Sequence, residues 1–308
     1  MTKIELPLER LTEALDGGIE DGSSVLFLAD LAVDKAEFAK ALCNFRLDEE
    51  DNLIYFINNK MPEYIDQRID KEGREDKVSI VDGFSSTLDK DSGHEYQLES
   101  SLKDDTEDFL EESKELAKKA IEENEGFGST FVLDSLDAFV GQWDAVEDMV
   151  NEIKPVAERT NTVTYYFLPN LGFEEEGEQD TSIDELKEIF DYVIHLKGLE
   201  RSGIVLKFID VRKPEGIDTK VPYDVTAQGL VMYVPKILVT GPYDSGKSTT
   251  VQSMSEKAVS VDRLGTTVAL DHGAVERKGI KAELFGTPGQ KRFDWALDFL
   301  GKSTFGCF

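Results

Sequence analysis

Residues 241–248 (GPYDSGKS) constrain this chain more than any other stretch. They match the pattern G-x-x-x-x-G-K-[ST] in full. Residues 236–240 (KILVT) before them read as a short buried strand, and residues 249–259 carry apolar side chains at helical spacing. A glycine-rich turn between a strand and a helix lets backbone N–H groups converge on phosphate oxygens, which the positive end of the helix also attracts. The sequence therefore predicts a phosphate-binding loop for a nucleotide.

Within this loop the residue types predict their roles. Lys247 would reach the β- and γ-phosphates, and the hydroxyl of Ser248 would hold Mg²⁺. The remaining phosphate contacts are expected from Gly241, Asp244, Ser245, Gly246 and Thr249. A chance glycine-rich turn is the alternative, and the strand and helix on either side of the loop count against it.

Two later segments indicate which class of nucleotide-binding protein the loop belongs to. Residues 264–271 read LGTTVALD and residues 283–293 read ELFGTPGQKRF. They resemble the first switch and the D-x-x-G-Q segment of Ras-like small GTPases, in particular a prokaryotic group that carries F-G-T-P-G-Q. The resemblance implies that Thr267 caps Mg²⁺ through its hydroxyl, that the N–H of Gly289 touches the γ-phosphate, and that Gln290 is the catalytic residue that orients the attacking water.

The chain departs from this pattern at two points. Gly286 stands where most small GTPases carry a metal-side aspartate, so either Asp271 or Glu283 would have to replace that carboxylate through water. The chain also stops at Phe308, at the start of the expected fourth strand and before any guanine-reading N-K-x-D segment. We therefore expect a truncated domain, for which GTP follows from the resemblance alone and ATP is the alternative.

The region before this domain alternates strand and helix patterns. Helical stripes run through residues 109–120 and 143–157, and from residue 192 onward short strands follow one another directly, as in an antiparallel extension. This alternation predicts an α/β sheet with helices on both faces. The apolar runs suited to buried parallel strands are 24–28, 52–57, 77–81, 130–134 and 162–168.

This region resembles the RecA-superfamily ATPases of the KaiC-like kind. Residues 15–26 (LDGGIEDGSSVL) resemble their entry loop and first strand, Asp134 with Ser135 resembles the end of the Walker B strand, and residues 207–213 (KFIDVRK) resemble a late hairpin. The expected phosphate loop, residues 29–36, reads ADLAVDKA. It keeps a lysine but no glycine that would bring backbone amides close to phosphates.

Other chemistry of the ATPase pattern is missing as well. The expected catalytic carboxylates fall at Asn59 and Lys60, and neither is a general base at neutral pH. Asp30 and Asp34 in the former phosphate loop would repel a triphosphate. We therefore expect an inactive RecA-like domain that serves as a scaffold or an interaction surface.

The domain boundary is predicted near Pro235, which gives a RecA-like domain over 1–234 and a partial GTPase domain over 235–308. In the first domain Asp134 is interpreted as a structural residue at a strand end, and His195 as a hydrogen-bonded core residue. His272 follows the first switch segment and is a weaker candidate for a nucleotide contact.

The formal charge of −29, from 63 acidic and 34 basic residues, disfavours nucleic acid as a partner. Such an excess is typical of a halophilic organism with molar intracellular salt, with an acidic mesophile protein as the alternative. Cys43 and Cys307 provide no disulfide framework, and the N-terminus lacks a secretion signal. These features predict a cytoplasmic protein without membrane contact.

Three functions from different classes follow. The preferred one is a nucleotide-gated signalling protein, in which a GTPase-like switch with slow turnover acts through the RecA-like scaffold on a protein effector or on a second copy of the chain. The second is a non-enzymatic interaction protein with a remnant GTPase segment. The third is a RecA-like accessory of DNA repair, against which the acidic charge weighs.

Overall fold

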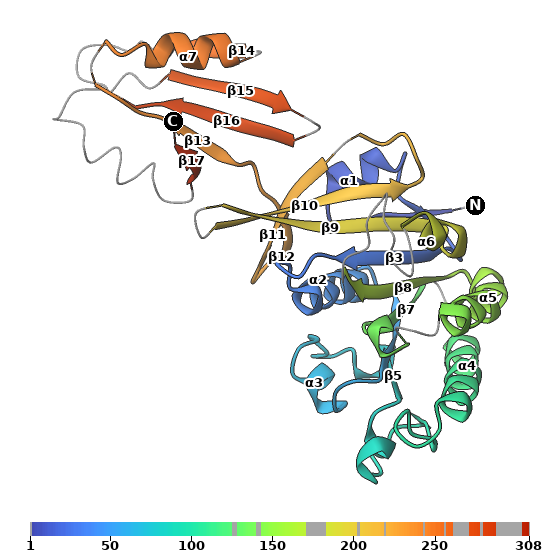
Figure 1. Ribbon diagram of the computed structural model, residues 1–308. Coiled ribbons are helices and arrows are strands. Elements are labelled where there is room, and N and C mark those ends of the chain that lie inside the picture. The colour runs from blue at the N-terminus through green and yellow to red at the C-terminus, as the bar shows by residue number, and fades with distance from the viewer. Residues whose placement is uncertain are drawn as a thin grey trace. The chain divides into compact units, whose positions relative to one another are not determined.

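A computed structural model describes residues 2–124, 128–139, 143–170, 183–201, 204–218, 220–242, 244–255, 257–260, 271–277, 280–287 and 304–307. The chain folds into two compact units, and each has a hydrophobic core of its own (Figure 1). The first unit comprises Met1–Lys197, Asp210–Ile217 and Val225–Val231, and the second comprises Gly198–Ile209, Asp218–Asp224 and Met232–Phe308.

The larger sheet has ten strands in the order β12-β11-β10-β9-β3-β8-β7-β4-β5-β6. From β9 through β3 to β6 the neighbouring strands are parallel, as the apolar runs predict. Strands β9 to β12 are consecutive in both the chain and the sheet. The strand bounds are β3 (Ser24–Ala29), β4 (Asn52–Ile57), β5 (Val78–Asp82), β6 (Tyr96–Gln97), β7 (Ser129–Leu133), β8 (Thr162–Pro169), β9 (Tyr192–Arg201), β10 (Ile204–Lys213), β11 (Lys220–Thr226) and β12 (Gly229–Met232).

A short antiparallel pair, β1 (Lys3–Ile4) with β2 (Ile19–Glu20), precedes this sheet. The helices of this region are α1 (Glu9–Ala14), α2 (Lys35–Asp48), α3 (Glu63–Asp66), α4 (Thr106–Glu123), α5 (Trp143–Thr160) and α6 (Ile183–Ile189). Single 3₁₀ turns lie at Glu75–Lys77, Ser85–Leu88 and Leu136–Phe139.

Helices cover both faces of this sheet, because side chains alternate along each buried strand. In β3, Leu26 and Leu28 belong to the core cluster formed with α4 and α5. Phe27 between them points the other way and meets Phe38 of α2, with ring centroids 5.1 Å apart. The predicted α/β layers are thus confirmed.

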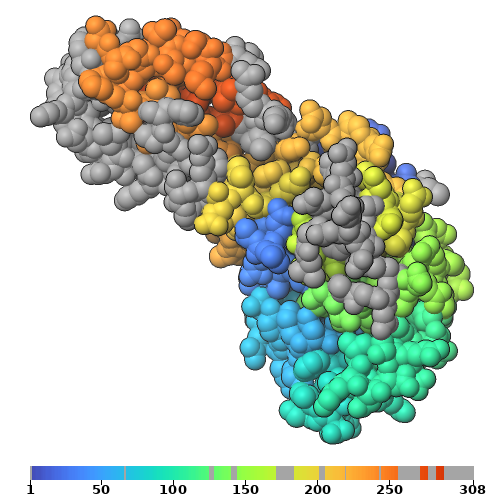
Figure 2. Space-filling view, in the orientation of Figure 1, coloured from blue at the N-terminus to red at the C-terminus, as the bar shows by residue number. Residues whose placement is uncertain are grey.

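Helix α4 has one buried and one solvated face. Its N-cap residue is Asp105, whose carboxylate accepts hydrogen bonds from the N–H groups of Glu107 and Asp108. Phe109 and Ala120 are buried on one side of α4, and most of its acidic side chains are exposed. This part of the chain is turquoise and green in Figure 2.

The second unit contains a five-stranded sheet in the order β14-β15-β16-β13-β17. Strand β13 is parallel to both of its neighbours, whereas β14, β15 and β16 pair antiparallel. Helix α7 packs on this sheet through Val251, which contacts Val239 and Leu284. The bounds are β13 (Lys236–Val239), α7 (Lys247–Met254), β14 (Lys257–Ser260), β15 (Asp271–Arg277), β16 (Ile280–Gly286) and β17 (Thr304–Cys307).

The helix after the loop is shorter than its apolar spacing predicts. It ends at Met254, because the next residue, Ser255, has an extended backbone. Ala258 lies in β14, opposite Gly273 of β15. The helical spacing of Ala258 is therefore misleading, because pairing with β15 satisfies this segment's backbone instead. The predicted strand before the loop is confirmed as β13, and a strand is present where the sequence predicts one near Phe308, as β17, the fifth described strand of this sheet in chain order.

Among the described residues, no helix is both long enough and apolar enough to cross a membrane.

Candidate phosphate-binding site

The loop between β13 and α7 is shaped by its glycines. Gly241 (φ 154°) and Gly246 (φ 84°) both have backbone conformations that favour glycine. A Cβ on Gly241 would lie 2.8 Å from the Oγ of Ser245, so the loop has no room for a side chain there. Asp244 (φ 61°) is also left-handed, which aspartate tolerates better than most residues. The loop therefore has the tight turn that the sequence pattern predicts.

The N-terminus of α7 has no side-chain cap. Gly246 is its N-cap residue, and no side chain in the described part of the loop accepts a hydrogen bond from a backbone N–H of the first turn. The N–H groups of that turn are thus open to an anion, and the helix dipole favours one. Ser248 and Thr249 of the first turn are exposed, so the turn is accessible from solvent.

The ammonium of Lys247 folds back over this loop. It donates to the carbonyl oxygens of Gly241 (3.0 Å) and Pro242 (2.6 Å) and lies 3.4 Å from the Oγ of Ser245. All three acceptors are neutral. A phosphate would bind the ammonium more strongly, because it adds the attraction between opposite charges that these neutral oxygens lack.

A carboxylate lies beside the predicted metal ligand. The hydroxyl of Ser248 donates to the Oδ2 of Asp271 over 2.5 Å. Asp271 begins β15 and is paired with Gly286, the last residue of β16. A Cβ on Gly286 would come within 3.0 Å of the Cβ and 3.2 Å of the Oδ2 of Asp271. The carboxylate of Asp271 thus occupies the space beside the missing side chain at position 286.

The alternative carboxylate, Glu283, lies at the other end of β16. It pairs with Lys236, the first residue of β13, whereas Gly286 pairs with Val239, the last one. Three residues of strand place Glu283 about 10 Å further along the sheet. Of the two residues that could replace the missing metal-side carboxylate, Asp271 is therefore the one that lies at the loop.

His272 faces away from this site. It follows Asp271 in β15 and therefore points to the opposite face of the sheet. There its ring stacks on Phe285, with centroids 4.8 Å apart, and its Nε2 lies 3.8 Å from the Oε2 of Glu283. The structure gives His272 no part in the loop.

The remaining predicted residues Thr267, Gly289 and Gln290 lie outside the described residues, and their roles stay predictions. Oxygen atoms of Ser248 and Asp271 are ligands that Mg²⁺ prefers, directly or through water. The residues that the structure does describe around the loop therefore fit a magnesium-bound phosphate group.

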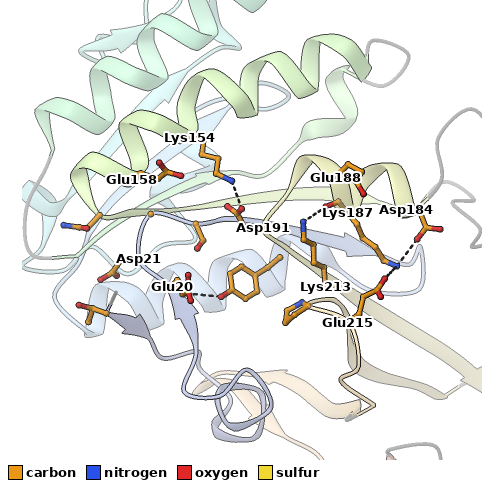
Figure 3. Close-up of a pocket in the computed structure, with 16 residues that line it drawn as sticks. Glu20, Asp21, Lys154, Glu158, Asp184, Lys187, Glu188, Asp191, Lys213 and Glu215 are labelled. Atoms are coloured by element: carbon orange, nitrogen blue, oxygen red, sulfur yellow. Dashed lines mark hydrogen bonds and ion pairs between the residues drawn. The ribbon is translucent and has the colours of Figure 1, made fainter.

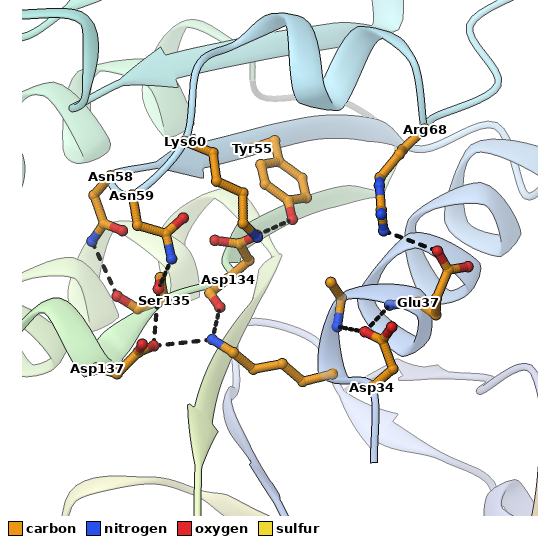
Figure 4. Close-up of polar contacts among 12 residues, drawn as sticks. Asp34, Glu37, Tyr55, Asn58, Asn59, Lys60, Arg68, Asp134, Ser135 and Asp137 are labelled. Carbon is orange, nitrogen blue, oxygen red and sulfur yellow. Dashed lines mark hydrogen bonds and ion pairs between the residues drawn. The ribbon is translucent and has the colours of Figure 1, made fainter. Parts of the chain in front are cut away.

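The first unit contains a second strand–loop–helix connection, between β3 and α2. Here the helix N-terminus is capped by the protein itself. The Oδ1 of Asp34 accepts from the N–H groups of Ala36 (3.0 Å) and Glu37 (3.1 Å), as Figure 4 shows. The amides that would meet a phosphate are thus bonded to a carboxylate.

The surviving lysine of this loop is also engaged. The ammonium of Lys35 donates to the carbonyl oxygen of Asp134 (2.6 Å) and to the Oδ1 of Asp137 (3.0 Å). Burial opposes ionisation of Asp137, but Lys35 and the hydroxyl of Ser135 still hold the pKa of this carboxyl below its usual value. Lys35 therefore serves as the counter-charge of a protein carboxylate.

The side chain of Asp134, which is 2% exposed, has two partners in the described part of the chain. Its Oδ2 accepts from the hydroxyl of Tyr55 (2.8 Å) and lies 3.4 Å from the ammonium of Lys60 (Figure 4). Burial and this neighbouring carboxylate raise the pKa of Tyr55. The amides of Asn58 and Asn59 bond to Ser135. No carboxylate of residues 58–60 is available as a base, as the sequence indicates.

His195 is confirmed as a hydrogen-bonded core residue. It is 4% exposed, and its Nε2 lies 2.7 Å from the Oδ1 of Asp30, which also accepts from the amide of Asn170 over 2.9 Å. Burial lowers the pKa of His195, and Asp30 offsets part of that effect. Asp30 is therefore committed to a contact within the fold.

A cavity of about 1100 Å³ lies at the amino ends of β3, β8 and β9, the opposite end of the sheet from the loop that begins at Asp30 (Figure 3). Its lysines are already engaged: Lys154 with Asp191 (2.5 Å), Lys187 with Asp184 (2.9 Å), and Lys213 with the carbonyl oxygens of residues 187 and 190. In open α/β sheets ligands bind at the carboxyl ends of the strands. We assign no ligand to this cavity.

No protein-family model matches this chain. A 69-residue stretch, 22% of the chain, is 39% identical to part of an uncharacterised protein of Methanocaldococcus jannaschii, and it covers 45% of that protein. The chain thus spans less than half the length of this curated relative. The crystal structure of a KaiC-like protein from Pyrococcus horikoshii superimposes with a TM-score of 0.52 over 75% of this chain and 99% of that one, at 13% identity. This likeness shows a RecA-like α/β fold, as the sequence of the first region predicts.

Proposed function

We propose that this protein is a nucleotide-binding regulatory switch of the P-loop class, in which residues 241–248 bind the phosphates of a magnesium nucleoside triphosphate. One observation carries the proposal. The hydroxyl of Ser248 is bonded to Asp271 directly beside Gly286, so a carboxylate is present at the one place where the sequence pattern lacks it.

The position of the loop in its sheet supports this assignment. It follows β13, which has a parallel neighbour on each side, and the loop leaves the carboxyl end of that strand. Ligands of α/β proteins bind outside the carboxyl ends of parallel strands. The open first turn of α7 and the side chain of Lys247 meet at this end.

The described residues divide the binding between them. The first-turn amides of α7 and the ammonium of Lys247 would bind phosphate oxygens, while Ser248 would ligate Mg²⁺ directly and Asp271 through water. A bound Mg²⁺ would neutralise charge on the β- and γ-phosphates. Sensing of the γ-phosphate by Thr267 and Gly289, and orientation of water by Gln290, are part of the proposal. Its preference for GTP rests on the Ras-like resemblance, with ATP as the alternative.

The first unit acts in this proposal as a RecA-like scaffold. It would pass the state of the loop to a protein effector or to a second copy of the chain. The acidic surface disfavours nucleic acid as the partner. We expect any hydrolysis to be slow.

The test is a titration of the full chain with fluorescent GTP and ATP in the presence of Mg²⁺. In the variant Lys247→Ala we expect affinity to fall by about 100-fold or more, because an ammonium–phosphate contact is lost. Lys40→Ala is the matched control, since Lys40 forms an ion pair with Glu37 on the surface of α2, in the first unit. Equal affinity of Lys247→Ala and the wild type would contradict the site, and negligible affinity for both nucleotides would remove the switch.

A second candidate function is a non-enzymatic interaction protein, which the blocked loop of the first unit favours. In that case residues 236–254 would be a remnant that binds nothing. Hydrogen exchange separates the two functions. If β13 and α7 are protected as strongly as β3 and α2, and protection of α7 rises with added nucleotide, the remnant reading fails.

A further inference from the structure

At the β3–α2 loop, side chains of the protein occupy the positions where the charges of a magnesium nucleotide would bind. A magnesium nucleotide brings an anion to a helix N-terminus and a cation to the carboxylate at a neighbouring strand end. In the first unit these two places are the N-terminus of α2 and the carboxylate of Asp134. A carboxylate of the protein already binds the N-terminus of α2, and an ammonium of the protein already lies beside Asp134.

The cation side is provided by Lys60. A carboxylate as buried as that of Asp134 needs a counter-charge, since a buried and unpaired charge is strongly destabilising. The ammonium of Lys60 lies 3.4 Å from Oδ2, whereas Oδ1 of Asp134 has no hydrogen-bond partner among the described residues. The ammonium is also held 4.4 Å from the ring centroid of Tyr64, which fixes its position.

The anion side is provided by Asp34. Its carboxylate bonds to two first-turn N–H groups of α2, at 3.0 Å and 3.1 Å, where the phosphate of a nucleotide would lie. A bound triphosphate would have to displace this carboxylate and would then lie against its negative charge. A bound divalent cation would likewise meet the ammonium of Lys60. The residues of this loop therefore do not fit a magnesium nucleotide.

We infer that Lys60 and Asp34 are built-in counter-ions of the RecA-like unit: Lys60 takes the place of the divalent cation, and Asp34 takes the place of the phosphate. The unit then keeps one charge-balanced state with no nucleotide bound. This inference concerns the first unit alone and is independent of whether the loop at residues 241–248 binds nucleotide.

A double-mutant cycle on the full chain tests the cation half. Lys60→Met removes the charge but keeps an aliphatic stem over Tyr64, and we expect the Tm to fall by roughly 5–10 °C. Asp134→Asn should also lower the Tm, because it leaves Lys60 without its buried partner. The double variant should recover at least half of the summed loss, because no buried charge is left unpaired. Lys40→Met is the matched control and should change the Tm by about 1 °C, as an exposed ion pair contributes little.

Two results would overturn the assignment of Lys60: a double variant as unstable as the sum of the single ones, or a Lys60→Met variant no less stable than the control. If Lys60→Met does not fold, the double variant decides the question. A folded double variant supports the pair, and an unfolded one refutes it.

Ligand binding tests the anion half. In the background Lys247→Ala, which removes the proposed contact in the second unit, 5 mM magnesium ATP (roughly the upper range of KM values) should leave the Tm of the first unit unchanged. The variant Asp34→Ala should lose stability, since an N-cap carboxylate contributes about 1 kcal/mol, or roughly 2–4 °C in Tm. A nucleotide-dependent rise in Tm in the Lys247→Ala background, or no loss in Asp34→Ala, would overturn the inference.

Discussion

The two strand–loop–helix connections of this chain share a backbone plan and differ in what meets the helix N-terminus. At α2 the N-cap is Asp34, whose carboxylate binds the first-turn amides. At α7 the N-cap is Gly246, which has no side chain to offer them. The lysine after each N-cap differs in the same sense: Lys35 is paired with a carboxylate, and Lys247 is held by neutral oxygens. The N-cap residue and the partner of the following lysine thus both distinguish the closed loop from the open one.

The difference in N-cap residue also affects the stability of the two helices. A side-chain cap stabilises a helix by about 1 kcal/mol, although glycine at the same position loses only a few tenths. The carboxylate cap of α2 is therefore worth only about a few tenths of a kcal/mol more than the glycine N-cap of α7. Leaving the first turn of α7 open costs little stability.

The largest expected effect comes from giving α7 the carboxylate that closes α2. Gly246→Asp places a negative charge against the phosphates; no atom lies within 4 Å of the added Cβ, although a φ of 84° strains any side chain there. We expect nucleotide affinity to fall by about 100-fold or more, measured by titration with fluorescent GTP. Circular dichroism should show an intact fold. The reciprocal variant Asp34→Gly should gain no nucleotide binding, because Lys60 still faces Asp134; unchanged binding by Gly246→Asp would break the comparison.

The next effect concerns the carboxylate beside Ser248. Asp271→Ala should raise the Mg²⁺ concentration needed for nucleotide binding by about 10-fold, since it removes one charged contact of the metal. The measurement is nucleotide affinity as a function of Mg²⁺. In the double variant Asp271→Gly/Gly286→Asp the carboxylate is placed on β16 and the Cβ of residue 271 is removed, so recovery is expected. Gly286→Asp alone should be destabilised, because its Cβ would lie 3.0 Å from that of Asp271.

A smaller effect follows from His195 of β9, which is bonded to Asp30 of the closed loop. Burial lowers the pKa of His195 in the folded state, despite the opposing effect of Asp30, while Lys197 and Asp210 also act on the ring. The folded state therefore favours neutral imidazole, and stability should be full above the ordinary pKa of about 6.5 and fall as the pH drops below it. Urea unfolding between pH 5 and pH 8 (roughly the range over which imidazole changes charge) measures this. A wild type and a His195→Gln variant with the same pH dependence would contradict it.

The smallest effect is general to the acidic surface. With a net charge of −29, repulsion opposes the folded state. Potassium chloride at about 1 M shortens the screening length from about 10 Å to about 3 Å, so the Tm should rise by a few degrees. Sucrose at equal osmolality serves as the control for exclusion effects. A rise no larger than that in sucrose would remove charge repulsion as a cause.

Local patterns in the sequence are sufficient to predict the buried strands β3, β4, β5, β7 and β8, the buried faces of α4 and α5, and the positions of both loops. The apolar run before Asp134 and the glycines at 241 and 246 need no distant partner to be interpreted, because buried strands and tight turns restrict residue type. The end of α7 was misjudged because Ala258 fits a helix and a strand equally well. Only its pairing with β15 decides between them.

The pairs that define the two sites depended on contacts far apart in the chain. The sequence shows that Lys60 replaces an expected carboxylate, but not that its ammonium lies beside residue 134. The sequence offers both Asp271 and Glu283 as replacements for the missing metal-side aspartate. The register between β15 and β16 places Asp271 beside Gly286 and so selects Asp271. Strand register is a tertiary property, and no local pattern near either residue encodes it.

The pairing of Asp271 with Gly286 has one more consequence. The carboxylate lies on β15, and the glycine whose missing side chain it replaces lies on β16. The two are adjacent only while these antiparallel strands keep their register. Sliding β15 past β16 by a single residue would turn the carboxylate to the far side of the sheet. If Asp271 binds a metal as proposed, that binding would depend on the alignment of the hairpin, and a partner that shifts the hairpin would weaken nucleotide binding without touching the nucleotide.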